Sequence, residues 1–315
     1  MTFKEAMDQL NIFPQCKKYG LSLWQCPQFL FLIMGIAIGI TAIVTYLLGT
    51  RYVKDPSLVA LIVLLLSILL FTLSFTIIRS LERIAEANRM KSEFISIVSH
   101  QLRSPLSNLK WSIELLNSGR LGKIEKKQAE YLKILTDNTQ RMGELVSDLL
   151  TVSRIEQGRL PFQKSSFSLA KLTEEIIEKY KPYASASNVE INFQAEKSLP
   201  QVTADTSRIK SVIENLLDNA IRYIKGGGEI EIKIDKKDNK LLFKIKDTGV
   251  GIPQEDQRRI FQKFFRSMNA MRHQTQGSGL GLYIAKSIIE KSGGKIWFES
   301  KEGEGTTFWF TLPTK

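Results

Sequence analysis

Three polar side chains fall at regular helical spacing in the segment ENLLDNAIRY, residues 214–223. Asn215, Asn219 and Arg222 stand at positions i, i+4 and i+7, so a helix would place all three on one face. Amide oxygens suit a hard Mg²⁺ ion, and a guanidinium group suits phosphate oxygens. The spacing therefore predicts a helix face that could hold a metal-bound phosphate, while the apolar residues between them pack against a sheet.

Two further segments carry groups that could hold the rest of a nucleotide. In LLFKIKDTGVGIP, residues 241–253, an alternating strand ends at Asp247 and opens into Gly249 and Gly251. A carboxylate at a strand end can accept a hydrogen bond from an exocyclic amine such as N6 of adenine, and the glycines allow a tight turn there. In GSGLGLYIAKSIIEKSGG, residues 277–294, glycines stand at the start of a helix whose free N–H groups favour polyphosphate. These glycines are Gly277, Gly279 and Gly281.

One of the two histidines stands in SHQLRSPLSNL, residues 99–109. His100 lies two positions from apolar stripe residues on either side, so it points away from the stripe and towards solvent. An exposed neutral imidazole has a free lone pair and can act as a nucleophile. Pro105 removes the N–H that would bond the carbonyl of Gln101, which predicts a bend in the helix beside the histidine. The other histidine, His273, falls in a polar loop and is interpreted as a solvated residue.

Two amphipathic helices are expected to carry the histidine. Apolar residues recur at three- and four-residue steps from Phe94 to Ile113 and again from Leu132 to Ile155, with the breaking sequence NSGRLGK, residues 117–123, between them. Two such helices with a short turn form an antiparallel hairpin. One hairpin cannot bury both stripes, whereas two hairpins in a symmetric homodimer can do so as a four-helix bundle.

Two uncharged apolar runs, residues 29–48 and 58–78, precede this hairpin. Each covers about 30 Å as a helix, which is the thickness of the hydrocarbon core of a membrane. The nine residues between them are too few for a receptor domain. Lysine and arginine flank the outer ends, so both termini are expected on the cytoplasmic side of the plasma membrane, in a multi-pass arrangement. The flanking basic residues would contact anionic membrane lipid.

The overall composition excludes few classes. The net charge of +12 is compatible with nucleic acid, an anionic membrane or phosphorylated ligands, and it does not choose among them. Cys16 and Cys26 have no histidine near them and do not match the spacing of a zinc site. The chain carries no glycine pattern of the Rossmann or P-loop type, so a nucleotide would be held in another way.

The order and spacing of these segments resemble a known family. FISIVSHQLRSPLSNLKW looks like the H-box of bacterial membrane sensor histidine kinases, which belong to two-component systems. ENLLDNAIRY resembles the N-box of their ATP-binding domain, and the segments around Asp247 and Gly279 resemble its G1 and G2 boxes. IFQKFFRS, residues 260–267, resembles the F-box, and GEGTTFWF, residues 303–310, resembles the final glycine motif and last strand.

The resemblance implies an enzyme, a protein histidine kinase. His100 would accept the γ-phosphate of ATP, and the phosphoryl group would then move to an aspartate in the receiver domain of a response regulator. Asn215 and Asn219 would serve Mg²⁺ and the phosphates, with Arg222 also on the phosphates. Tyr223 would line the adenine pocket, and Asp247 would bind adenine. The glycines that would shape the pocket and a lid between residues 252 and 277 are Gly249, Gly251, Gly277, Gly279 and Gly281. No direct nucleic-acid partner is expected.

The expected architecture is multidomain. It comprises a cytoplasmic N-terminal segment (1–28), a hairpin of two transmembrane helices (29–78), a signal helix (79–92), an all-α helical-hairpin domain for dimerisation and phosphotransfer (93–158), a linker (159–167) and a C-terminal α/β sandwich that binds ATP (168–315). Within the last part, apolar alternation predicts strands in VEINFQ, EIEIKI, LLFKIK, KIWFES and TFWFTL.

Two positions depart from the family pattern. Gln101 stands where the family usually has Glu or Asp, an acid thought to orient the imidazole and take up its proton. An amide can accept a hydrogen bond but is no base, so autophosphorylation is expected to be slower and not absent. Ser104 stands where Thr or Asn is usual, at a position linked to removing phosphate from the regulator. A serine hydroxyl can still orient water, so a phosphatase activity is a further expectation.

Two other function classes stay open on the residues alone. An ATP-driven conformational machine of the wider ATPase family would hydrolyse ATP without a phosphohistidine, although the segment around His100 and the apolar runs disfavour it. A signalling scaffold would bind ATP and dimerise without transferring a phosphoryl group, and Gln101 is its one supporting feature.

Overall fold

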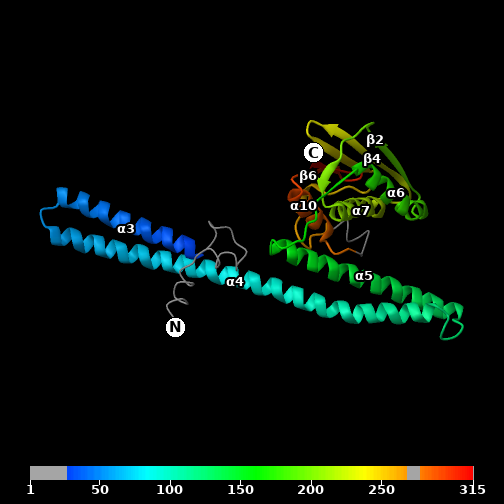
Figure 1. The fold of residues 1–315 in the computed structure, drawn as a ribbon, viewed down its shortest axis with the longest axis horizontal. Helices are drawn as coiled ribbons and strands as arrows, with labels where there is room; N and C mark the ends of the chain where they lie inside the picture. Colours follow the sequence, from blue (N-terminus) through cyan, green and yellow to red (C-terminus); the bar gives the residue numbers. More distant parts are fainter. Residues whose placement is uncertain (1–26, 268–276, 315) are drawn as a thin grey trace. The chain divides into compact units, whose positions relative to one another are not determined.

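The computed structural model describes residues 27–267 and 277–314 (Figure 1). The interpretations of Cys16, Cys26 and His273 fall outside the described residues. The described chain divides into two compact units, one formed mainly by residues up to Val98 and the other mainly from Ser99 onward.

The first unit is a hairpin of two long helices, α3 (Pro27–Tyr52) and the first part of α4 (Pro56–Asn117). The rings of Phe31 and Phe71 lie 6.1 Å apart, and Val59 packs so closely on Gly49 that a side chain there would collide with it. These two contacts lie at opposite ends of the hairpin, so the helices run antiparallel. Both are long and apolar enough to cross a membrane, and most of their apolar side chains are exposed.

Both helices extend beyond the apolar runs of the sequence. Of the nine residues between those runs, only residues 53–55 are not helical. The carboxylate of Asp55 begins α4 by accepting hydrogen bonds from the backbone N and the hydroxyl of Ser57, at 3.0 and 2.7 Å. Pro56 then occupies the first helical position, where its missing N–H costs nothing.

The second apolar run, the expected signal helix and the histidine-bearing helix form one continuous helix in the structure. α4 has 62 residues and contains Pro105 in its interior. The bend expected at that proline stays a prediction. α4 ends at Asn117, and a turn follows in which Gly119 and Gly122 have left-handed φ angles of 70° and 124°. α5 (Lys126–Glu156) then runs back, as the breaking sequence predicts.

The α4–α5 hairpin buries only part of its apolar stripes. Leu106, Ile113, Val146 and Leu150 are buried, with at most 7% of each residue exposed. Other apolar stripe residues are about half exposed in the single chain: Leu102, Leu109, Leu135 and Met142. The exposed remainder agrees with the sequence argument that one hairpin cannot cover both stripes.

The C-terminal part of the second unit is an α/β sandwich. Its mixed sheet has the strand order β2-β4-β5-β7-β6, with β2 parallel to β4 and the other neighbours antiparallel. The strands are β2 (Val189–Ala195), β4 (Gly228–Lys237), β5 (Lys240–Asp247), β6 (Ile296–Lys301) and β7 (Gly305–Pro313). The helices are α6 (Leu169–Ala186), α7 (Thr206–Tyr223), the short α8 (Gln254–Gln257) and α10 (Gly281–Lys291). All five strands expected from apolar alternation are confirmed.

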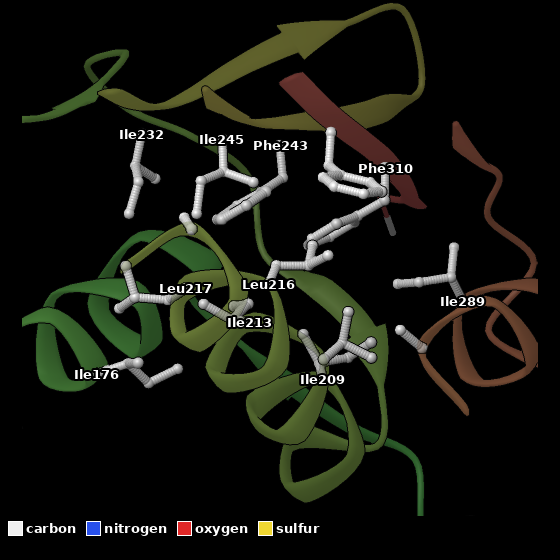
Figure 2. Packing of buried hydrophobic residues seen from close by; sticks show 14 of the residues in the cluster. Ile176, Ile209, Ile213, Leu216, Leu217, Ile232, Phe243, Ile245, Ile289 and Phe310 are labelled. Carbon is white, nitrogen blue, oxygen red and sulfur yellow. The ribbon is translucent and has the colours of Figure 1, made fainter. Parts of the chain in front are cut away.

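The core lies between this sheet and the helix layer (Figure 2). Ile209, Ile213 and Leu216 of α7 are at most 1% exposed, and they face Phe243 of β5 and Phe310 of β7, whose rings stack 4.5 Å apart. Burying each such side chain stabilises the fold by about 1.5–3 kcal/mol relative to leaving it in water. The apolar face of α7 is thereby fixed on the sheet, which also fixes the direction of its polar residues.

The expected linker contains regular structure that the sequence reading missed. Ser165–Phe167 form strand β1, which pairs antiparallel with β3 (Val202–Ala204). The backbone N of Gln163 also donates to Asp205 Oδ2 at 2.8 Å, and Oδ1 of the same carboxylate caps α7 by accepting from Arg208 N. Three residues are too few to show alternation, so only tertiary pairing reveals this strand.

Candidate functional site

A cavity of about 620 Å³ brings together nearly all of the residues predicted to bind a nucleotide. The predicted residues that line it are Asn215, Asn219, Arg222, Tyr223, Asp247, Gly251, Gly277, Gly279 and Gly281. Gly249 is not among the lining residues, but its backbone N donates to Asp247 Oδ1 at 2.8 Å. Segments separated by more than sixty residues in sequence therefore converge on one site.

Asp247 ends β5 as a buried carboxylate, only 7% exposed. Oδ1 accepts hydrogen bonds from the backbone N of Gly249 and of Thr306, at 2.8 and 3.2 Å. Burial raises the pKa of this carboxyl to about 6, and the two hydrogen bonds oppose the shift without cancelling it. Since both fixed donors meet Oδ1, Oδ2 is the oxygen that could accept a hydrogen bond from a ligand amine.

The loop after Asp247 is held by the end of α7 and by the β6–β7 turn. Val250 N donates to the carbonyl of Tyr223 at 3.0 Å, and Gly303 N donates to the carbonyl of Val250 at 2.8 Å. Gly251 has a φ of 67°, and a Cβ there would lie 2.1 Å from the carbonyl oxygen of Lys301. Only glycine fits this position, so the tight turn predicted from the sequence is confirmed.

The two asparagines of α7 lie together at the start of α10. Asn219 Nδ2 donates to Asn215 Oδ1 at 3.2 Å. Gly281, the first residue of α10, lies so close that an added Cβ would stand 2.0 Å from Asn215 Nδ2. Leu280, which precedes the helix, supplies no capping side chain, so the first N–H groups of α10 are open to an anion from the cavity.

The amides of Asn215 and Asn219 suit a metal ion that enters the site together with a phosphate ligand. They suit a metal ion held by the protein alone less well. In the described part of the chain, no group of three or more His, Cys, Asp or Glu side chains could hold a metal. Mg²⁺ usually takes few protein ligands and completes its shell with phosphate oxygens and water. The side-chain amide oxygens of Asn215 and Asn219 are ligands of the kind that Mg²⁺ binds.

Several cavity residues were not predicted from the sequence, among them Asp218 and Tyr180. Asp218 of α7 lies with its Oδ2 2.8 Å from Arg222 Nε, and burial raises its pKa although the charge of Arg222 opposes the shift. Tyr180 of α6 lines the same cavity, and burial, together with the negative charges of Asp218 and Glu214, raises its pKa to about 12. The position of Asp218 at i−4 from Arg222 was a signal that could have identified it.

His100, Gln101 and Ser104 lie on α4 and are exposed, and none of them is among the residues that line the cavity. Their neighbours Ser99 and Leu106 are buried. The imidazole therefore faces away from the hairpin interior, as its position in the stripe predicts. The structure thus shows an exposed imidazole on α4, and a cavity whose lining residues do not include it.

Two parts of the chain match known domain families. Residues 90–158 match the His Kinase A (phospho-acceptor) domain, and residues 204–315 match the Histidine kinase-, DNA gyrase B-, and HSP90-like ATPase. The first match contains His100, and the second contains every predicted residue that lines the cavity.

Curated relatives cover the same region. The chain is 32% identical over 229 residues to the circadian input-output histidine kinase CikA of Synechococcus elongatus, covering 72% of this chain and 30% of that protein. It is 37% identical over 226 residues to the sensor protein SrrB of Staphylococcus aureus, covering 72% of this chain and 38% of that protein. The chain thus spans about a third of the length of the curated relatives it matches.

Two solved structures resemble most of the chain. Full-length ShkA in complex with AMPPNP gives a TM-score of 0.60 at 26% identity, covering 70% of this chain and 46% of that one. The histidine kinase ThkA in complex with the response regulator protein TrrA gives a TM-score of 0.50 at 25% identity, covering 72% of this chain and 64% of that one.

Proposed function

This chain belongs to the sensor histidine kinases of two-component systems, and from that premise we propose that it phosphorylates itself on His100 with ATP and passes the phosphoryl group to an aspartate of a response regulator. One observation carries the proposal. An exposed histidine in a phospho-acceptor domain accompanies a single cavity that gathers the amides, the guanidinium and the buried carboxylate of an ATPase domain.

ATP binding is assigned to the cavity beside α7. Asp247 Oδ2 accepts a hydrogen bond from the exocyclic amine of adenine, which selects adenine over a base that presents a carbonyl at that position. Arg222 and the open N–H groups of α10 bind phosphate oxygens, and Asn215 and Asn219 face the Mg²⁺ that accompanies them. Bound Mg²⁺ neutralises part of the phosphate charge.

The transfer step uses His100 as the nucleophile. An imidazole nitrogen forms a bond to the γ-phosphorus as the bond to the leaving ADP oxygen breaks, and the proton on the other ring nitrogen is lost to solvent or to a base. Gln101 can hold the ring through its amide oxygen but cannot take that proton. Positioning and charge neutralisation supply most of the rate enhancement in such phosphoryl transfers.

We propose two further roles for the α4 segment near His100. The exposed apolar stripe forms a four-helix bundle with a second copy of the chain, which buries the half-exposed leucines. Ser104, one turn after His100, orients a water for removing phosphate from the response regulator.

The membrane arrangement is also part of the proposal. α3 and the first part of α4 cross the inner membrane as a hairpin, with both termini and the ATP-binding domain in the cytoplasm. Support comes from the length and apolar character of both helices and from the cation–π contact of Arg79 with Phe75, 4.8 Å from its ring centroid. Arg79 is also the first charged residue after the second apolar run, and basic residues that flank such a run are typical of its cytoplasmic end.

Radiolabelled ATP tests the function directly. The parent chain is expected to acquire an acid-labile label, and His100→Ala is expected to lose it while still binding ATP. Release of free phosphate without labelled protein would instead indicate an ATP-driven conformational machine. ATP binding with neither label nor phosphate release would indicate a scaffold.

A further inference from the structure

The cavity face of α7 carries a carboxylate, Asp218, besides the three polar residues that the sequence singled out. Asp218 stands three residues after Asn215 and four before Arg222, so all of these side chains share one face of the helix. Its Oδ2 lies 2.8 Å from Arg222 Nε, with the Asp218 and Arg222 side chains 27% and 29% exposed. Asp218 and Arg222 are therefore a partly buried ion pair in the wall of the site.

The guanidinium group of Arg222 approaches Asp218 through Nε. Nε is buried and its N–H is not well aligned on the carboxylate oxygen, so the two groups are held mainly by charge. Arg222 also lines the cavity, so its guanidinium group can reach a ligand there. Because the guanidinium is a rigid planar fork, fixing Nε also fixes the directions of the terminal N–H groups.

Both members of the ion pair line the cavity that gathers the predicted ligand residues, and neither is fully covered by protein. Tyr180 of α6 lines the same cavity. A ligand in the cavity can therefore reach the guanidinium group that Asp218 contacts.

We propose that Asp218 is a positioning residue for ATP, whose carboxylate orients the Arg222 guanidinium so that its terminal N–H groups meet phosphate oxygens. The inference rests on the proposed function and deepens it. Without the carboxylate, the long arginine side chain regains rotamer freedom that must be lost again when the phosphates bind. The loss should fall on the phosphates and not on adenine, which is bound at Asp247 on another element.

A double-mutant cycle on the detergent-solubilised full chain tests this inference, with affinities for ATP and for adenosine measured by calorimetry in the presence of Mg²⁺. Asp218→Ala is expected to weaken ATP binding roughly tenfold, within the range found for coupled neighbouring residues. Adenosine binding should change less than twofold. In an Arg222→Ala background, Asp218→Ala should have no further effect on ATP binding, because the residue acts only through the guanidinium.

Matched variants separate positioning from structural damage. Glu290→Ala removes the carboxylate of another i, i+4 pair, that of Lys286 and Glu290 on α10, away from the lining residues, and should leave both affinities unchanged. Asp218→Glu should restore part of the ATP affinity. If Asp218→Ala fails to fold, the isosteric Asp218→Asn provides the same comparison.

Several results would overturn the inference. ATP affinity that is unchanged or tighter in Asp218→Ala would mean that the carboxylate does not orient Arg222, or that it competes with phosphate. Equal losses for ATP and adenosine, or a full effect that persists without Arg222, would indicate general damage to the site. A parent chain that binds adenosine but gains nothing from the phosphates would contradict the proposed function itself, before any variant is compared.

Discussion

At the scale of single residues, Asp247 in the cavity and His100 on α4 lie in opposite environments. Asp247 is charged at neutral pH in a place where burial favours its neutral form. His100, by contrast, is exposed on the surface of α4. The proposed function gives the first residue a role in binding adenine and the second a role in accepting the phosphoryl group, so the two roles can be tested separately.

Asp247→Asn should raise the stability of the nucleotide-free chain and should weaken its binding of ATP. The folded pKa of about 6 lies above the ordinary value of 3.8, so the contribution of this group to stability is fully present below pH 3.8 and is lost as pH rises through about 6. A neutral amide escapes that loss, and we expect a gain of up to about 3 kcal/mol at pH 7, smaller at pH 5. Thermal unfolding of the parent and the variant at pH 7 and pH 5 measures this gain in stability.

ATP affinity provides the second half of this prediction. A protonated or amidated side chain presents a donor to the adenine amine, which is itself a donor. Affinity of the parent should therefore fall as pH decreases through about 6, and Asp247→Asn should bind weakly at every pH. A variant that is less stable than the parent at pH 7, or that binds ATP equally well, would contradict this assignment.

Gln101→Glu should accelerate autophosphorylation. The introduced carboxylate can accept the imidazole proton that the amide cannot, and general-base assistance is typically worth about 10²–10⁴ in rate. Gln101→Asn, which shortens the amide without adding a base, is the matched control. Single-turnover rates of His100 labelling at saturating ATP provide the measurement, and a glutamate variant no faster than the parent counts against the idea.

At the scale of elements, the site depends on how α7 and α10 meet. The sequence predicted α7 because its apolar residues recur with helical spacing, and the same spacing placed Asn215, Asn219 and Arg222 on one face. It did not predict that Asn215 would pack against the first turn of α10, because that contact arises only when both helices settle on the sheet. Tertiary packing thus decides the geometry of residues whose types were evident beforehand.

Gly281→Ala should weaken binding of ATP with Mg²⁺ by roughly tenfold, because its Cβ would displace the amide of Asn215. The fold should survive, since the group that must move is the end of a flexible side chain. Gly143→Ala in α5 is the matched control, because nothing lies within 4 Å of its added Cβ. That control should bind ATP with the affinity of the parent. Calorimetry measures the affinity of both variants, and an unchanged affinity in Gly281→Ala would contradict the prediction.

Short elements escaped prediction for a different reason. Apolar alternation in the sequence predicts the five strands of the main sheet. β1 and β3 have only three residues each, which is too short for alternation, and they pair with each other. Likewise, α4 passes without interruption from the apolar hairpin to the histidine, although the sequence suggested separate segments. Helix propensity extends through residues 79–92 because no glycine or proline stands there.

At the scale of the whole molecule, the single chain leaves two large apolar surfaces exposed. α3 and the first part of α4 expose apolar side chains on most sides, and the α4–α5 hairpin exposes half of its stripe. The first surface suits a bilayer, and the second suits another copy of the chain. Both surfaces could be predicted from the sequence. The first consists of two uninterrupted apolar runs, and the second of apolar residues at regular helical spacing.

Leu109→Glu combined with Leu135→Glu should dissociate the dimer and abolish the phosphorylation that depends on it. Both leucines are about half exposed in the single chain, and a charge cannot be buried in the bundle without a partner. Lys133→Glu makes the same total change of charge at an exposed position away from the stripe and should remain dimeric. Light scattering in detergent distinguishes the two, and a dimeric double variant would contradict the four-helix bundle.

The most direct test of the central claim is to locate the phosphoryl group by mass spectrometry after the detergent-solubilised parent chain has been incubated with ATP and Mg²⁺. Phosphorylation at His100, retained under alkaline handling and lost in acid, is the predicted result. Phosphate on a serine, threonine or aspartate, or an unmodified chain that nevertheless consumes ATP, would contradict the account.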